Sequence, residues 1–273
     1  MVLKVRFPFV VIPAVLLASC SAPVPLDIPD DFGVYVALGD SFAAMGSASA
    51  DTTGPVDCYR SIDNYPSLVL SDPLIGSGTD ATCSSAQTAD VLANQIDTLT
   101  PDTNLVTLSI GGNDIRFGDI ATCFADMMRG SEVSCTSTLE ETVTTQLATL
   151  PADLDRVYTA INQRNPDARI ITTGYLPLLS NDEDCAPLDR VPRSEVAWAV
   201  SLTEEINSVV RDAAARHSAT FVLPENAFAH TVCADPTKRW ADVTGVETDA
   251  YPMHPTPLGQ KEMAAAVLAE IRA

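Results

Sequence analysis

Basic residues are scarce in this chain of 273 residues: 16 Lys and Arg stand against 36 Asp and Glu, so the net charge is −20. Such a charge repels nucleic-acid phosphates and anionic lipid headgroups, which argues against a nucleic-acid-binding protein. After residue 31 the sequence also lacks repeats, long linkers and shifts in composition. We therefore expect one domain over residues 32–273, with a well-solvated surface and a preference for neutral or cationic ligands.

Long apolar runs are absent, apart from a short one near the front. The run from Phe7 to Ala18 is too short for a confident membrane span, and Lys4 and Arg6 precede it. Basic residues followed by a short apolar core are typical of a signal peptide, which we place at residues 1–19. An uncleaved anchor is the less favoured interpretation because Pro13 interrupts the run.

The end of this segment leaves two processing routes open. Leu17-Ala18-Ser19-Cys20 resembles a bacterial lipobox, in which the cysteine becomes the lipidated first residue, so Cys20 is the predicted lipidation site. Residues 20–31, rich in proline, would then form a tether, and membrane contact would occur only through the lipid. Ordinary cleavage near Ala22 would instead release a secreted protein.

The cysteines show no Cys-x-x-Cys pair, so we expect no zinc site and no other metal. Beyond Cys20, six cysteines remain, an even number that predicts three disulfides in an exported protein. Six cysteines allow 15 pairings, of which sequential pairing is the simplest because each bridge would close a local loop. They are Cys58, Cys83, Cys123, Cys135, Cys185 and Cys233.

Short β-rich runs alternate with amphipathic helical patterns along the domain. Strands are predicted at 34–38, 105–110, 169–173 and 220–223, and helices at 88–99, 138–162, 194–217 and from 257 to the end. Pro151 should kink or divide the second helix. Strands alternating with helices predict a three-layer α/β/α sandwich around a mostly parallel sheet.

Ser41 and Asn113 follow the ends of two predicted strands, where ligands bind in such sheets. A serine hydroxyl can act as a nucleophile beside a base, and the Asn113 amide can stabilise an oxyanion. Alternatively, Ser41 could only cap a helix, and Gly111-Gly112-Asn113-Asp114 could be a plain turn.

The base is sought among only three histidines. His217 ends a predicted helix, where a cation suits the helix dipole, and His230 lies in a loop three residues before a cysteine. His254 stands in a loop just before the last helix, so we favour it as the base, a choice that rests partly on the following resemblance.

These residues resemble the blocks of the GDSL or SGNH hydrolase family, and within it the secreted actinobacterial esterases and lipases of the Streptomyces type. The resemblance covers about residues 32–273. Gly39-Asp40-Ser41 resembles the family's first block, Gly111-Gly112-Asn113-Asp114 the third and His254-Pro255 the last, and Cys83-Ser84-Ser85-Ala86 stands at the second. It implies a flavodoxin-like sandwich and chemistry that needs no metal or cofactor. It also implies the sequential disulfides Cys58–Cys83, Cys123–Cys135 and Cys185–Cys233.

The resemblance further implies an oxyanion hole made of the Ser41 N–H, a backbone N–H of the second block and the Asn113 side chain. Two positions depart from the usual pattern. Ser85 stands where the second block usually has glycine, and Tyr251 stands where an acid usually supports the histidine. Some secreted members use a backbone carbonyl there, so we expect the Tyr251 carbonyl to orient His254, with Asp249 as the alternative.

The expected function is that of a secreted or lipid-anchored serine hydrolase, monomeric, cleaving small-molecule or lipid esters. Two alternatives stay open: an envelope acyltransferase using the same site, and a non-catalytic envelope-binding lipoprotein. The segments 117–135 and 176–191 are expected to be loops that line the substrate pocket.

Overall fold

A computed structural model describes residues 1–3, 32–181 and 185–273. From residue 4 onward, the predicted signal peptide, Cys20 and the tether lie outside the described residues. No helix in the described ranges has the length and apolarity needed to cross a membrane.

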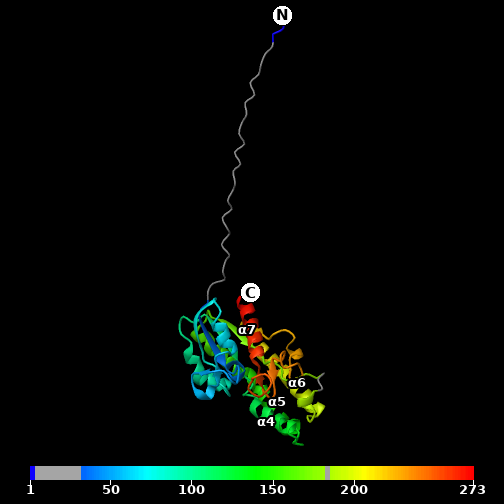
Figure 1. Ribbon diagram of the computed structural model, residues 1–273. Coiled ribbons are helices and arrows are strands. Elements are labelled where there is room, and N and C mark those ends of the chain that lie inside the picture. The colour runs from blue at the N-terminus through cyan, green and yellow to red at the C-terminus, as the bar shows by residue number, and fades with distance from the viewer. Residues whose placement is uncertain (4–31, 182–184) are drawn as a thin grey trace.

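The centre of the domain is a five-stranded parallel sheet (Figure 1). Its order is β4-β1-β5-β6-β7, which is the flavodoxin-like order 2-1-3-4-5 once these five strands are counted along the chain. The strands are β1 (Phe32–Gly39), β4 (Ile75–Asp80), β5 (Leu105–Ser109), β6 (Arg169–Thr173) and β7 (Thr220–Val222).

Four of these strands were predicted, and β4 was not. Gly76 and Gly78 lie in β4, where glycine is disfavoured by its conformational freedom, and most of the strand is exposed at the sheet edge. A Cβ at Gly78 would come within 2.3 Å of the Tyr35 carbonyl oxygen, so close packing against β1 requires glycine there. Only the neighbouring strand reveals this requirement.

Helices cover both faces of the sheet, as the alternation of side chains along β1 requires. Tyr35 and Ala37 join the core under α2 (Tyr65–Leu70) and α7 (Pro257–Ile271). Val36 and Leu38 join the larger core on the opposite face. That face is covered by α3 (Thr88–Asp90) with η2 (Val91–Gln95) and η3 (Ile96–Thr98), α5 (Cys135–Arg164) and α6 (Arg193–Arg216). The predicted α/β/α sandwich is confirmed.

Two helices differ from expectation. Pro151 lies inside α5, which continues through it as one helix. The segment after Ile115, expected as a loop, forms α4 (Phe117–Met128). The remaining short elements are α1 (Ser41–Ala44), β2 (Thr52–Thr53), η1 (Val56–Cys58), β3 (Arg60–Ser61), η4 (Ala186–Leu188), η5 (Ala227–Ala229), β8 (Ala241–Asp242) and β9 (His254–Pro255).

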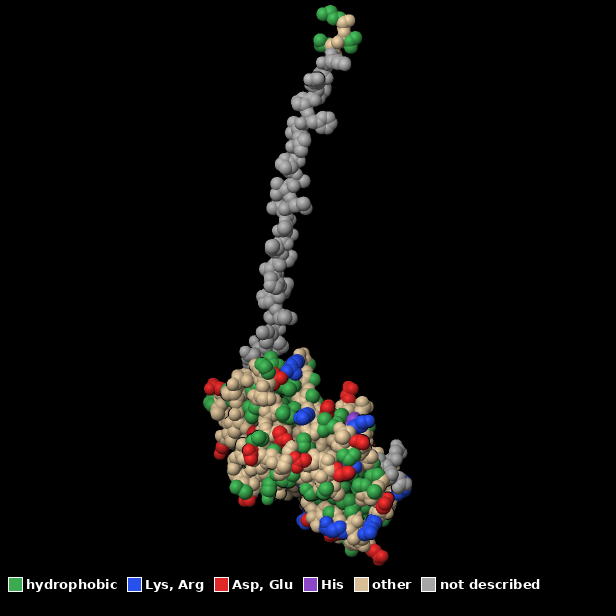
Figure 2. Space-filling model, viewed as in Figure 1, with side chains coloured by type: hydrophobic (Ala, Val, Ile, Leu, Met, Phe, Trp, Pro, Cys, Tyr) green, Lys and Arg blue, Asp and Glu red, His purple; other side chains and the backbone are tan. Residues whose placement is uncertain are grey.

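Three disulfides join the sequential pairs that the resemblance implies: Cys58–Cys83, Cys123–Cys135 and Cys185–Cys233. The first ties η1 to the residues just before Ser85, and the second ties α4 to the start of α5. On the face that Figure 2 shows, acidic side chains are spread out rather than gathered in one patch. This fits the expectation of a well-solvated surface.

Candidate active site

Ser41 is the first residue of α1 and follows the carboxyl end of β1. The chain leaves the sheet here in a fixed direction because the Asp40 N–H donates to the Ser109 carbonyl at 2.9 Å. Asp40, rather than Ser41, is the helix N-cap, since its Oδ1 accepts the Phe42 N–H at 2.9 Å. The Ser41 hydroxyl is therefore left for another partner.

That partner is His254, whose Nε2 lies 2.8 Å from Ser41 Oγ across 213 residues of sequence. The other ring nitrogen, Nδ1, lies 2.7 Å from the carbonyl oxygen of Pro252. A carbonyl only accepts, so Nδ1 carries the proton and the Nε2 lone pair is free to receive the serine proton. The pair has the geometry of a nucleophile and its base.

The prediction that the Tyr251 carbonyl orients His254 is wrong by one residue. Met253 takes a left-handed φ of 61°, and the resulting turn carries the Pro252 carbonyl onto the ring. Asp249 does not serve either: it is exposed, and its carboxylate accepts from the backbone N–H and hydroxyl of Ser49. The arrangement is a Ser–His pair supported by a backbone carbonyl.

The imidazole of His254 packs near Phe42 and Phe117, with ring centroids 5.4 and 6.1 Å away. Burial disfavours the charged ring and lowers the pKa of His254 below its usual 6.5, while the bond to Pro252 opposes part of this effect. The ring is thus neutral, and able to accept a proton, at pH 7.

The other two histidines have structural partners elsewhere. His217, at the end of α6, lies 3.0 Å from an Asp155 carboxylate oxygen and stacks on Tyr158. His230 stacks on Trp240, with ring centroids 3.9 Å apart. Within the described residues, His254 alone bonds to the serine.

The loop carrying Asn113 follows β5 and is tied to the loop of the second block. Asn113 Nδ2 donates to the Ala86 carbonyl at 3.0 Å, and the Asp114 carboxylate accepts from the backbone and hydroxyl of Thr88. The Asn113 amide has two hydrogens, and this bond uses one of them. The second remains for a ligand.

Ser85 adopts a φ of 63°, in the left-handed region that favours glycine. The serine therefore takes up the conformation that a glycine would adopt readily, and its side chain is exposed. Among the described residues, no protein acceptor meets the backbone N–H of Ser41 or of Ser85. Both N–H groups are available as donors.

Tyr175, which sequence reasoning missed, lies two residues after β6 and joins the first and third blocks. Its hydroxyl donates to Asp40 Oδ2 at 2.6 Å and accepts the Gly112 N–H at 2.7 Å. Full burial raises the pKa of Asp40 to about 7, although the bonds from Tyr175 and Phe42 oppose this rise. One sequence signal could have identified Tyr175 as a site residue: it follows a predicted strand, at the sheet edge that it shares with Ser41 and Asn113.

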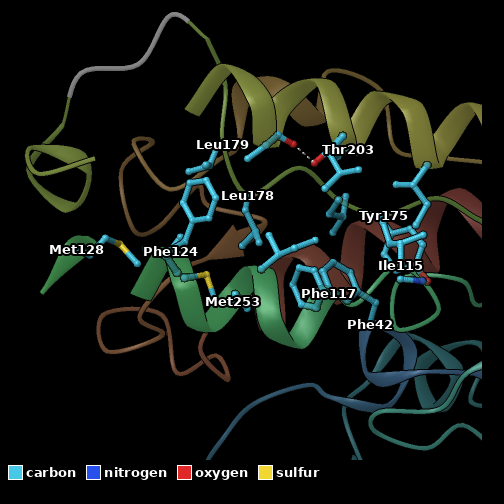
Figure 3. Close-up of a pocket in the computed structure, with 18 of the residues that line it drawn as sticks. Phe42, Ile115, Phe117, Phe124, Met128, Tyr175, Leu178, Leu179, Thr203 and Met253 are labelled. Carbon is cyan, nitrogen blue, oxygen red and sulfur yellow. Dashed lines mark hydrogen bonds between the residues drawn. The ribbon is translucent and has the colours of Figure 1, made fainter. Parts of the chain in front are cut away.

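An apolar trough lies between α4 and α6 (Figure 3). It adjoins the Ser–His pair through Phe42, which lines the trough and packs against the His254 ring. Phe42 and Tyr175 mark one end, and Met128 and Leu179 mark the other. The hydroxyl of Thr203 in its wall donates to the Ala199 carbonyl at 2.9 Å, so it does not need a ligand. The lining comprises Phe42, Gly112, Ile115, Phe117, Ile120, Ala121, Phe124, Met128, Tyr175, Leu176, Leu178, Leu179, Leu188, Ala199, Leu202, Thr203, Ile206, Val243 and Met253.

Both predicted pocket segments, 117–135 and 176–191, contribute to this trough, although α4 does so as a helix. The residues from α6 were not anticipated, because a helix that covers the sheet gives no sequence signal of also facing a ligand. Across the residues with described placement, no group of three or more His, Cys, Asp or Glu side chains could hold a metal ion.

Comparisons with known proteins show which family the chain belongs to. Residues 37–262 match the model of the GDSL-like Lipase/Acylhydrolase family. Lipase 1 of Streptomyces coelicolor is 32% identical over 83% of this chain and 82% of its own length. The lipase of Streptomyces rimosus is 34% identical over 84% and 82%, respectively.

Two solved structures are also similar. The extracellular lipase of Streptomyces rimosus superposes with a TM-score of 0.76 at 30% identity, over 88% of this chain and 99% of that one. Phospholipase A1 of Streptomyces albidoflavus does so with a TM-score of 0.74 at 31% identity and the same coverage. This chain therefore belongs to the GDSL-like lipase/acylhydrolase family and is a carboxylic ester hydrolase.

Proposed function

We propose that this protein is an exported lipase that hydrolyses esters of long-chain fatty acids through Ser41 and His254. The observation that carries the proposal is the placement of the Ser41–His254 hydrogen bond, 2.8 Å long, beside the apolar trough. Phe42 connects the Ser41–His254 pair to the trough, because it follows Ser41, packs against the His254 ring and lines the trough. An ester carbonyl at Ser41 would thus have its acyl chain directed between α4 and α6.

In the first step, Ser41 Oγ attacks the ester carbonyl carbon while its proton passes to His254 Nε2. The imidazolium that forms keeps its Nδ1–H on the Pro252 carbonyl, which is 2.7 Å away. His254 then protonates the leaving alcohol as the carbon–oxygen bond breaks, which leaves an acyl-serine. Water deprotonated by His254 attacks this ester, the bond from the acyl carbon to Ser41 Oγ breaks, and Ser41 Oγ takes the proton back from His254 as the fatty acid leaves.

The negative oxygen formed at each attack needs donors that are already in place. In the proposal these are the N–H groups of Ser41 and Ser85 and the Asn113 side-chain amide. The unused backbone N–H groups support this assignment, as does the second amide hydrogen of Asn113. The left-handed φ of Ser85 also supports the assignment, because Ser85 has the backbone conformation that a glycine at this position would adopt readily.

The substrate class follows from the trough and the charge. Its apolar lining suits an unbranched acyl chain, at about 0.8 kcal/mol for each buried methylene. The net charge of −20 favours neutral esters over anionic ones. The similar proteins include lipases and a phospholipase A1, so acylglycerols and zwitterionic phospholipids are the candidates.

We further propose that the protein acts outside the cytoplasm, as a monomer and without a cofactor. The three disulfides support an oxidising compartment, and one similar structure is an extracellular lipase. Lipidation at Cys20 and cleavage near Ala22 are the two routes to that location. Mass spectrometry of the mature N-terminus distinguishes them, since only the first adds acyl groups.

The function is tested by hydrolysis of p-nitrophenyl esters from acetate to palmitate, with Ser41→Ala as the control. We expect activity that rises with chain length and is abolished in the variant. A residual rate equal to the wild type would exclude Ser41 as the nucleophile. Product analysis with added glycerol measures transfer: esters of glycerol as the main product would favour the acyltransferase instead.

A further inference from the structure

Beyond the pairing of β1 with β5 and the bond from the Asp40 N–H to the Ser109 carbonyl, one side-chain hydroxyl links the first and third blocks of the site. Asp40 precedes Ser41, Gly112 precedes Asn113, and the Tyr175 hydroxyl bonds to both, at 2.6 Å to Asp40 Oδ2 and 2.7 Å to the Gly112 nitrogen. Asp40 uses its other oxygen to cap α1 through the Phe42 N–H. Both partners of the hydroxyl are buried.

The position of this hydroxyl is fixed from the opposite side by α6. Asn207 Oδ1 accepts the Tyr175 N–H at 2.7 Å, and Asn207 Nδ2 donates to the Tyr175 carbonyl at 3.0 Å. The Tyr175 ring packs edge-on against Phe42, with centroids 5.0 Å apart. A Cβ at Gly112 would lie 3.1 Å from the ring, so glycine lets the Gly112 backbone approach the tyrosine closely.

We infer that Tyr175 is a positioning residue, whose hydroxyl sets the spacing between the nucleophile Ser41 and the oxyanion donor Asn113. The inference rests on the proposed function of these two residues. A ligand oxygen must meet donors from both segments at once, and small displacements of such donors are costly to the rate. Other bonds hold each loop to its own neighbours, but the hydroxyl joins the residues directly before Ser41 and Asn113.

A positioning role predicts a change in kcat and KM that differs from the effect of a general loss of stability. Tyr175→Phe keeps the ring that lines the trough, so binding of the acyl chain should be preserved. It leaves the Gly112 N–H and Asp40 Oδ2 unpaired, so the two loops lose the bridge between the residues directly before Ser41 and Asn113, although the backbone bond from Asp40 to Ser109 remains. We expect kcat to fall on the order of 10- to 100-fold while KM changes less than about 2-fold.

Tyr158→Phe is the matched control. The Tyr158 hydroxyl is also buried and bonds to Thr172 Oγ1 at 2.6 Å, but it joins α5 to β6 and touches neither catalytic loop. Both variants remove one buried hydroxyl, which makes two hydrogen bonds in Tyr175 and one in Tyr158, and thermal melting measures the stability that each variant loses. Only Tyr175→Phe should lose turnover.

Two further readouts separate positioning from general damage. Affinity for an alkyl boronic acid, which mimics the tetrahedral intermediate on serine, should fall in parallel with kcat, whereas affinity for dodecanoic acid should not. In an Asn113→Ala background, Tyr175→Phe should cost clearly less than in the wild type, because the donor that it positions is gone.

Three results would overturn the inference: unchanged kcat in folded Tyr175→Phe, equal losses in the two tyrosine variants, or fully independent effects of Tyr175→Phe and Asn113→Ala. If Tyr175→Phe does not fold, Asp40→Asn decides, because it exchanges one acceptor oxygen of the same network for an amide and should show the same kcat-selective loss. Failure of the proposed function itself would appear separately, as wild-type activity that is absent or survives Ser41→Ala.

Discussion

Narrowing the trough should change the chain-length preference without changing the chemistry. Ala199 lies on α6 and lines the trough. In Ala199→Phe a six-carbon ring would occupy space that the acyl chain needs, enough to displace about four methylene groups. At about 0.8 kcal/mol for each, the loss is roughly 3 kcal/mol, or about 150-fold in kcat/KM for long-chain esters.

Short esters provide the internal comparison. The acyl chains of acetate and butyrate esters are too short to fill the trough, so their kcat/KM in Ala199→Phe should stay within about 2-fold of the wild type. The matched control is Ala197→Phe, which adds the same ring two residues earlier on α6, on an exposed position. The assay is kcat/KM over a series of p-nitrophenyl esters, with thermal melting to verify that each variant is folded.

A uniform loss over all chain lengths in Ala199→Phe would refute the assignment of the trough to the acyl chain. So would a long-chain loss of equal size in Ala197→Phe, because that side chain does not line the trough.

Four further outcomes are expected. Asn113→Ala should lower kcat by about 10²–10³ and stay folded, and near-wild-type turnover would remove its role in the oxyanion hole. Asp249→Asn should leave kcat/KM unchanged, since its carboxylate bonds to a distant loop, and a large loss would restore it as the partner of the catalytic base. The kcat/KM of the wild type should rise with pH around a midpoint below 6.5, because burial lowers the pKa of His254; a midpoint above 6.5 would contradict this. Folding raises the pKa of the Asp40 carboxyl from its usual 3.8 to about 7. The protonated carboxyl therefore contributes to the free energy of unfolding at pH 4, and this contribution, about 4 kcal/mol, is lost by pH 8. The free energy of unfolding, measured with urea at pH 4 and pH 8, should fall between these pH values in the wild type but not in Asp40→Asn. If the wild type and the variant differ by the same amount at both pH values, this prediction is wrong.

The sequence determined the elements whose signals are local. Four strands were predicted from β-rich runs that end at glycine or proline, and the alternation of these runs with helical patterns predicts the layered sandwich. The same pattern indicates Ser41 and Asn113 as candidate site residues, because strand ends of a parallel sheet share one edge. His254 was favoured among three histidines, with support from the family resemblance, which also supplied the disulfide pairing.

The tertiary structure decided which groups support these residues. The Pro252 carbonyl reaches the His254 ring only because Met253 adopts a left-handed φ that turns the chain, and no residue type there predicts this conformation. The trough exists because α4 and α6 lie on either side of it. From the sequence, the first of these segments was expected to be a loop and the second only an amphipathic helix.

Tyr175 shows the limit most clearly. Its hydroxyl joins residues that lie 135 and 63 positions away in the sequence. Local patterns specify the backbone and the face that a side chain takes, because propensity and periodicity act over a few residues. A hydrogen bond across the sheet edge depends on the register and packing of strands far apart in the chain, and only the folded structure sets these.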